Sequence, residues 1–183
     1  MNIWKGRRIR LRAIEPEDAE HIHRWNQDPS WGRNLDFAWP PTSLASVRAW
    51  AQEQSLRKLE EDSYHWLIET LKGDPAGLID THLCDRRVGT FSYAVAIAPE
   101  HRSQGYAAEA VRLVLRYYFD ELRYQKVTVE VHDYNTASLR LHARLGFQRE
   151  GTLRRMGFTD GHHFDIVHLG MTVEEFRADD EEA

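Results

Sequence analysis

A polar loop between a strand and a helix carries the clearest chemical signal in this sequence. The strand predicted over residues 90–98 is followed by the polar run PEHRSQ, and Gly105 then opens a helix with Tyr106-Ala107-Ala108. The first N–H groups of a helix have no internal partner and lie at the positive end of the helix dipole. Because glycine and alanine let an anion approach closely, the loop predicts a phosphate or pyrophosphate site.

The loop matches neither of two well-known phosphate-binding motifs. No Gly-Lys-Ser/Thr follows as in a P-loop, and the glycine triplet of a dinucleotide-binding fold is missing. Nucleoside triphosphates and nicotinamide dinucleotides are therefore not predicted ligands. Taken alone, the loop also allows a structural interpretation, in which Gly105 only satisfies the backbone geometry of a strand-to-helix turn.

The hexapeptide Arg102-Ser103-Gln104-Gly105-Tyr106-Ala107 resembles the Q/R-x-x-G-x-G/A signature of the GNAT acetyltransferase superfamily. The tetrapeptide starting at Asn135 and the tripeptide starting at Leu145 are similar to the N-x-x-S and L-G-F elements of one branch, which contains the ribosomal-protein N-terminal acetyltransferases RimJ and RimL. The runs RIRLRAIEPEDAEHI and GFQREGTLRRMGFTDGHHFDIVHLGM also resemble that branch. The likeness therefore spans nearly the whole chain.

This resemblance implies an N-acetyltransferase that moves an acetyl group from acetyl-CoA to a primary amine by direct attack. It implies that the loop binds the coenzyme A pyrophosphate, that strand residues pair with the pantetheine amides, and that the N-x-x-S element contacts the pantetheine arm and the sulfur. The cofactor-binding residues expected on this basis are Ile97, Ala98, Arg102, Ser103, Gln104, Gly105, Tyr106, Ala107, Ala108, Asn135 and Ser138.

Direct attack needs a neutral amine, a group that accepts its proton and a group that protonates the departing thiolate. For the thiolate, the resemblance places Ser138 near the coenzyme sulfur, while His142 stands where many GNAT enzymes have a tyrosine. The two lie one helical turn apart and share a face of the predicted helix. Structural roles stay open for both, as a first-turn serine behind an Asn135 N-cap and as a histidine on the helix surface.

The proton acceptor is less well defined by the sequence. In the RimL-like branch a carboxylate lies on the strand after Glu150-Gly151, but the corresponding residue here is Gly157. Glu130, His132 and His82 remain as candidates, with a water relay as the other route. Glu130 therefore joins Ser138 and His142 as a predicted catalytic residue.

An aromatic segment is the candidate for the acceptor site. Trp31, Phe37 and Trp39 lie among Gly, Asn, Asp and Pro residues between positions 30 and 41, so the segment is predicted to be an irregular loop. Loops carry specificity, and aromatic surface favours ligand binding. A loop held in place by its own aromatic side chains is the structural alternative.

The family resemblance does not choose the acceptor, which we expect to be a protein N-terminus or a small-molecule amine such as an antibiotic, a polyamine or an amino acid derivative. The missing carboxylate at Gly157 makes a coenzyme A binding or sensing module with little or no turnover the alternative function.

No metal cofactor is expected. None of the 10 histidines forms a helical H-E-x-x-H motif or pairs with cysteines at ligand spacing. His162-His163 beside Gly161 is predicted to be an exposed part of a hairpin. Cys84, the single cysteine, is predicted to be a packing residue.

The predicted elements alternate between strands and helices. Hydrophobic periodicity and turn residues predict strands at 8–13, 64–70, 76–83, 90–98, 126–131 and up to about 172, and helices from Pro16 to before Pro29 and at 43–61, 106–122 and 136–145. The resemblance implies an α/β fold with a mixed, mainly antiparallel sheet flanked by helices. Two central parallel strands, 91–98 and 127–132, are expected to splay apart.

Size and charge narrow the remaining possibilities. A chain of 183 residues predicts one acetyltransferase domain over residues 1–175 with an acidic tail at 176–183. The net charge of −5 argues against a nucleic-acid partner. No apolar stretch approaches the length of a membrane span and the start lacks a signal-peptide pattern, so we expect a cytoplasmic monomer or homodimer without membrane contact.

Overall fold

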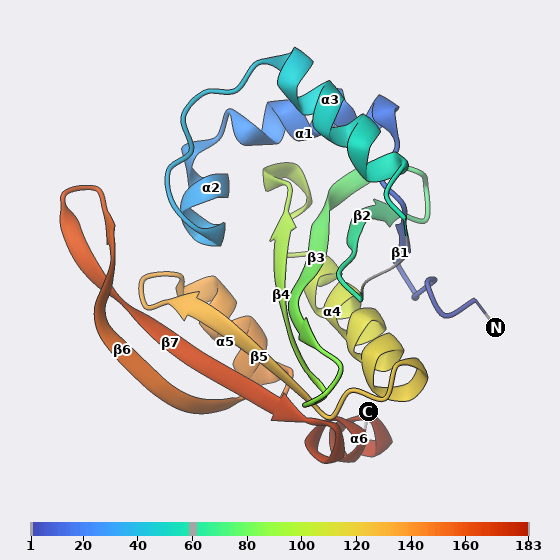
Figure 1. Cartoon of the computed structure of the whole chain (residues 1–183), viewed down its shortest axis with the longest axis vertical. Coiled ribbons are helices and arrows are strands. Elements are labelled where there is room, and N and C mark those ends of the chain that lie inside the picture. The colour runs from blue at the N-terminus through green and yellow to red at the C-terminus, as the bar shows by residue number, and fades with distance from the viewer. Residues whose placement is uncertain (1, 59–61, 183) are drawn as a thin grey trace. The chain divides into compact units, whose positions relative to one another are not determined.

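The computed structural model describes residues 2–58 and 62–182. Within these residues, seven strands form a mixed sheet in the order β1-β2-β3-β4-β5-β7-β6 (Figure 1). The pairs β1–β2, β2–β3, β5–β7 and β6–β7 are antiparallel, and β4 pairs with β5 in parallel. The strands are β1 (Ile9–Arg12), β2 (His65–Thr70), β3 (Pro75–Asp85), β4 (Thr90–Ile97), β5 (Lys126–His132), β6 (Gln148–Thr159) and β7 (His162–Thr172).

Six α-helices and three shorter helical segments connect these strands within the described residues. The mixed, mainly antiparallel sheet with helices is the predicted fold class, which is thereby confirmed. The helices are α1 (Ala19–Asn26), α2 (Pro29–Leu35), α3 (Leu44–Ser55), α4 (Tyr106–Arg116), α5 (Thr136–Arg144) and α6 (Val173–Glu182), with 3₁₀ turns η1 (Pro16–Asp18) and η2 (Pro99–His101) and a π-helical turn η3 (Tyr117–Glu121). None of the helices in the described part of the chain has the length and apolarity needed to cross a membrane.

The chain divides into two compact units. The first unit contains the residues up to Thr81 together with Ala94–Leu113. Its core lies where α1, α2 and α3 meet the strands, and Figure 1 shows α1 and α3 side by side. The buried core residues are Ile14, Ala19, Ile22, Trp25, Trp31, Val47, Ala51, Leu67 and Ala98.

The second unit contains His82–Tyr93 and the chain from Val114 onward. The alternating valines 127, 129 and 131 of β5 are buried, as the period-two pattern predicts. Phe91 stacks on Tyr118 with ring centroids 4.0 Å apart. β6 and β7 form a long hairpin, visible in Figure 1. The parallel register of β4 with β5 covers Thr90–Ser92 and Lys126–Thr128, at the start of both strands.

Two predicted boundaries were wrong, and the segment predicted to be an acidic tail begins within a helix. The segment after Pro29 is not a loop throughout, because the Asp28 side chain accepts a hydrogen bond from the Ser30 N–H and Pro29 occupies the first turn, so α2 begins there. The helix predicted over 43–61 ends at Ser55, and positions 59–61 lie outside the described residues. The expected tail from 176 lies within α6, whose Phe176 is buried against Phe119.

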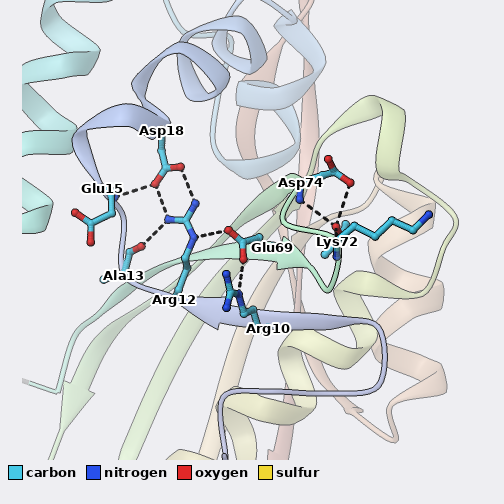
Figure 2. A network of polar contacts seen from close by, with 9 residues as sticks. Arg10, Arg12, Ala13, Glu15, Asp18, Glu69, Lys72 and Asp74 are labelled. Carbon is cyan, nitrogen blue, oxygen red and sulfur yellow. Dashed lines mark hydrogen bonds and ion pairs between the residues drawn. The ribbon is translucent and has the colours of Figure 1, made fainter.

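A polar network joins β1, β2 and the start of the first helical segment (Figure 2). Arg12 donates two hydrogen bonds of 2.8 Å to the carboxylate of Asp18, and its Nε donates to Glu69 at 2.7 Å. Arg10 also pairs with Glu69. Asp18 and Glu69 are 4% and 5% exposed. Arg10 and Arg12, two residues apart on β1 and therefore on one face of the strand, are held by two buried carboxylates.

Candidate active site

The loop that leads into α4 belongs to the first unit and has the geometry of an anion site. Gly105 has a φ of +79°, and Ser103 has a φ of +61°. A Cβ at Gly105 would also lie 2.9 Å from Nη1 of Arg8. The left-handed backbone favours glycine there, whereas the exposed end of the Arg8 side chain can move aside for a Cβ. The helix starts at Tyr106, and its first backbone hydrogen bond runs from the Glu109 N–H to the Gly105 carbonyl at 3.2 Å. The N–H groups that come before Glu109 in the first turn have no partner within the helix.

Two arginines place positive charge beside this loop. Nη1 of Arg8 donates to the Gln104 carbonyl at 2.6 Å, and the Arg8 N–H donates to Glu109 at 2.9 Å. Nε of Arg102 donates to the Ile97 carbonyl at 3.2 Å. The side chains of Arg8 and Arg102 are 61% and 43% exposed, so both can still contact a ligand. The loop therefore combines a glycine, the start of a helix and two nearby guanidinium groups. This combination fits a pyrophosphate.

The backbone at the end of β4 already makes hydrogen bonds within the first unit. The N–H of Ala98 donates to the Ala76 carbonyl of β3 at 2.8 Å, so it is not available to a pantetheine amide. The Ala98 carbonyl accepts from the His101 N–H at 2.9 Å, as the Ile97 carbonyl does from Arg102. Because a carbonyl oxygen has two lone pairs, both residues stay predicted pantetheine contacts.

The predicted thiolate donors lie on α5 in the second unit. Oδ1 of Asn135 accepts a hydrogen bond from the Ser138 N–H at 3.1 Å, so Asn135 is the N-cap of α5. Oγ of Ser138 lies 3.3 Å from Nδ1 of His142. Ser138 and Asn135 are both partly exposed. The sequence placed Ser138 and His142 on one face of a helix, and the structure confirms this.

His142 is buried, not on the helix surface. It is 3% exposed, and its ring packs against Phe147 and Tyr93 at centroid distances of 5.0 Å and 5.8 Å. Nε2 of His142 lies 2.8 Å from Oη of Tyr93, and Nδ1 lies 2.8 Å from the Ser138 carbonyl. Sequence reasoning missed Tyr93, although its place on the large-residue face of β4 marked it as a core residue.

These contacts determine which atoms carry protons. A carbonyl oxygen only accepts, so Nδ1 of His142 is the donor to Ser138 O and Nε2 accepts from the Tyr93 hydroxyl. Burial lowers the pKa of His142, an effect that the Ser138 hydrogen bond partly offsets. Burial also raises the pKa of Tyr93 well above its ordinary value. At neutral pH the pair is therefore a neutral imidazole and a protonated phenol.

The predicted base Glu130 occupies an exposed position on β5. Its side chain is 61% exposed and lies 3.6 Å from Nε2 of its cross-strand neighbour His168. Gly157 stands where the resemblance to the RimL-like branch predicts a carboxylate, and a Cβ there would lie 2.0 Å from the ring of Phe164, its partner across the hairpin. A carboxylate at 157 would collide with this ring, which explains the glycine.

Two other base candidates and the hairpin histidines also belong to the second unit. The ring of His132 contacts Tyr134 and Phe164, and His82 lies on β3 beside Cys84, whose Sγ is 3.6 Å from the His82 carbonyl. His162 and His163 are exposed in the β6–β7 hairpin, as predicted. Among the described residues, no group of three or more His, Cys, Asp or Glu side chains is arranged to hold a metal ion.

A pocket of about 380 Å³ lies in the first unit, between the helices α1–α3 and the strands β2–β4. Trp31 and Trp39, two of the residues predicted to bind the acceptor, line it, and so do Ala94 and Ala96 of β4. Phe37 does not line it and is 51% exposed. Acceptor binding by Phe37 therefore stays a prediction, and this residue lies outside the pocket lining.

Among the lining residues that sequence reasoning missed, three carry aromatic or ionisable side chains. Trp50 enters from α3, and His65 and Asp80 enter from β2 and β3, where they are direct partners in the antiparallel register. His65 also contacts Trp50, with ring centroids 5.9 Å apart. Asp80 could have been noticed as the carboxylate that follows the apolar run AGLI in β3.

Comparison with known families decides the identity of this arrangement. The family described as "Acetyltransferase (GNAT) domain" matches residues 8–148, which include the loop, the pocket and α5. The chain belongs to the GNAT acetyltransferase family. This GNAT protein is an acetyl-CoA-dependent acetyltransferase, and its loop residues fit the pyrophosphate of that donor as described above.

Individual relatives support the same family. The GNAT protein is 40% identical over 173 residues to the SPbeta prophage-derived uncharacterized N-acetyltransferase YokL of Bacillus subtilis, covering 94% of each chain. It is 22% identical to spermidine N(1)-acetyltransferase of Escherichia coli, covering 93% of this chain and 89% of the relative. The structure of Vibrio cholerae spermidine N-acetyltransferase with CoA and spermine superposes with a TM-score of 0.81 at 22% identity, covering 92% and 98% of the two chains.

Proposed function

We propose that this GNAT protein acetylates a primary amine that binds in the pocket of the first unit. The observation that carries this proposal is the composition of the pocket wall. The pocket reaches Ala94 and Ala96 of β4, the strand that leads into the cofactor loop, and it contains a carboxylate and an imidazole in Asp80 and His65. A small-molecule amine has room there, since ligand pockets typically measure about 300–1,000 Å³.

The loop residues hold the donor in this proposal. The N–H groups at the start of α4 bind the pyrophosphate, and Arg8 and Arg102 balance its charge. Acetyl-CoA supplies the acetyl group as a thioester: the C–N bond to the amine forms, the C–S bond breaks, the amine loses one proton and the thiolate gains one. Asn135, Ser138 and the backbone of Ile97 and Ala98 are the further contacts proposed from the resemblance to the RimJ and RimL branch.

The proton steps are assigned to residues of the chain. Nδ1–H of His142 points to the carbonyl and the hydroxyl oxygen of Ser138, so the hydroxyl proton of Ser138 is not needed for that contact. We therefore keep Ser138 as the donor to the thiolate and assign His142 the role of positioning it. In the pocket, Asp80 and His65 are better placed to accept the proton of the amine than the exposed Glu130.

An acceptor screen tests this function. Purified protein is incubated with acetyl-CoA and a panel of amines, thiol release is followed by absorbance, and products are identified by mass spectrometry. We expect one N-acetylated amine for each coenzyme A released. Thiol release without an acetylated amine would indicate hydrolysis, and binding of coenzyme A without thiol release would indicate a binding module. Either result contradicts the proposal.

A further inference from the structure

The wall of the pocket in the first unit is mostly apolar and aromatic. Three tryptophans, Trp31, Trp39 and Trp50, line it together with aliphatic side chains from all three helices and from β3. Trp31 is 2% exposed and stacks on Trp25, so it forms the floor, whereas Trp39 is 36% exposed. A wall of this kind gains free energy from burying an apolar or aromatic group, at roughly 25 cal/mol for each Å² removed from water.

The charges of the wall are few and confined to one side. Of the described residues that line the pocket, Asp80 is the one carboxylate, and neither lysine nor arginine is among them. Asp80 and His65 are register partners on the neighbouring strands β2 and β3. The opposite side of the pocket contributes aliphatic side chains such as Ile22 and Val47, together with the uncharged polar residues Asn26, Thr42 and Ser46. One end of a ligand therefore meets a carboxylate, and the other meets side chains without a negative charge.

We infer that the acceptor is a monoamine with an apolar or aromatic body, and that Asp80 binds its amino group. This inference rests on the proposed function and names the substrate class. A single ammonium group is matched by Asp80 and by the faces of the tryptophans. A second or third ammonium on the same chain would lie among uncharged side chains, where the described lining residues offer no second carboxylate to pair with it. Polyamines therefore fit this pocket poorly, although relatives of low identity carry the name spermidine acetyltransferase.

A matched pair of acceptors separates the two classes. Hexylamine and 1,6-diaminohexane have the same length and differ in the second amino group, and 2-phenylethylamine adds an aromatic body. We expect kcat/KM for hexylamine and 2-phenylethylamine to exceed that for 1,6-diaminohexane and spermidine by at least about tenfold, the ratio that corresponds to 1.4 kcal/mol. Equal or higher kcat/KM for the diamine would overturn the inference while leaving the acetyltransferase function intact.

A substitution at the rim of the pocket tests the charge argument directly. Ser46 is exposed, lines the pocket and lies in the first turn of α3, where a carboxylate is well tolerated. Ser46→Asp should raise the ratio of kcat/KM for 1,6-diaminohexane to that for hexylamine by about five- to tenfold, because a second ammonium then has a partner. Ala45→Asp is the matched control, since Ala45 is exposed in the same turn and does not line the pocket.

The role of Asp80 has its own test with two measurements. Asp80→Asn should lower kcat/KM for hexylamine by about 10- to 100-fold, the loss of one charge-assisted contact. Quenching of tryptophan fluorescence by 2-phenylethylamine, without acetyl-CoA, should weaken in parallel, because three tryptophans line the pocket. An unchanged kcat/KM and unchanged quenching in Asp80→Asn would overturn the assignment. If no amine is acetylated by the wild type while coenzyme A still binds, the proposed function fails instead.

Discussion

The hydrogen bonds around His142 determine what two neighbouring side chains can do. Buried histidines usually serve either packing or proton transfer, and here both ring nitrogens are committed, one to Tyr93 and one to Ser138. A neutral imidazole held in this way has one acceptor and one donor, and both are used. Its remaining contribution is to fix the first turn of α5 and the direction of the Ser138 hydroxyl.

Kinetics of single variants distinguish these roles. Ser138→Ala should lower kcat by about 10²-fold or more with little change in acetyl-CoA affinity, because a general acid contributes on that scale. His142→Gln should lower kcat less and reduce the free energy of unfolding, because it disturbs a buried hydrogen-bonded cluster. Steady-state rates and thermal unfolding of both variants are the measurements. A large loss of kcat in His142→Gln alone would transfer the role to His142, and wild-type rates in both would assign protonation of the thiolate to solvent.

At the scale of elements, the network around Arg12 holds β1 and β2 to the first helical segment. Burial raises the pKa of Asp18 and of Glu69. The hydrogen bonds and charge of Arg12, with the Glu15 N–H for Asp18 and Arg10 for Glu69, more than offset this, so both pKa values lie below their ordinary values. The same contacts raise the pKa of Arg12, with the Asp18 hydrogen bond as the largest cause. Carboxylates with a lowered pKa stabilise the fold when they are ionised.

Acid unfolding tests this network. Stability from Asp18 and Glu69 should be fully present above their unfolded pKa of about 4 and be lost as the pH falls below it, through the lower folded values. Asp18→Asn should reduce the free energy of unfolding at pH 7 by about 1–3 kcal/mol, because the charge-assisted pair is gone. The free energy of unfolding of this variant should also decrease less steeply below pH 4 than that of the wild type. Urea unfolding across pH measures both effects. Glu17→Gln, an exposed neighbour, is the control, and an unchanged slope in Asp18→Asn would contradict the argument.

The sequence predicted most elements because their signals are local. The alternation of β5, the amphipathic stripe of α4 and the glycine before it each depend on a few neighbouring residues. The errors arose where two signals compete or where partners are distant. Pro29 can end one helix or begin another, and Asp28 as an N-cap decides for the second. The pocket residues His65 and Asp80 meet only through strand register, which no local pattern reveals.

At the scale of the whole molecule, thermal stability with and without coenzyme A is the most direct test of whether the loop binds the donor. A ligand that binds the folded state stabilises it by RT ln(1 + [L]/Kd), which is about 2.7 kcal/mol at a concentration of 100 Kd. For a protein of this size, 1 kcal/mol shifts Tm by roughly 2–4 °C. Saturating coenzyme A should therefore raise Tm by roughly 5–10 °C in the wild type.

The loop glycine provides the variant and a second glycine provides the control. Gly105→Asp adds a negative charge and a side chain where φ is +79° and where a Cβ would approach Arg8, so it should abolish the coenzyme A shift in Tm. Gly161→Asp introduces the same side chain at a φ of +81° in the β6–β7 hairpin, where nothing lies within 4 Å of the added Cβ. It should carry a comparable backbone strain and keep the full coenzyme A shift.

Measuring Tm for both variants with and without coenzyme A separates strain from ligand binding. A full shift in Gly105→Asp would show that the pyrophosphate binds elsewhere, whereas loss of the shift in both variants would attribute the effect to strain.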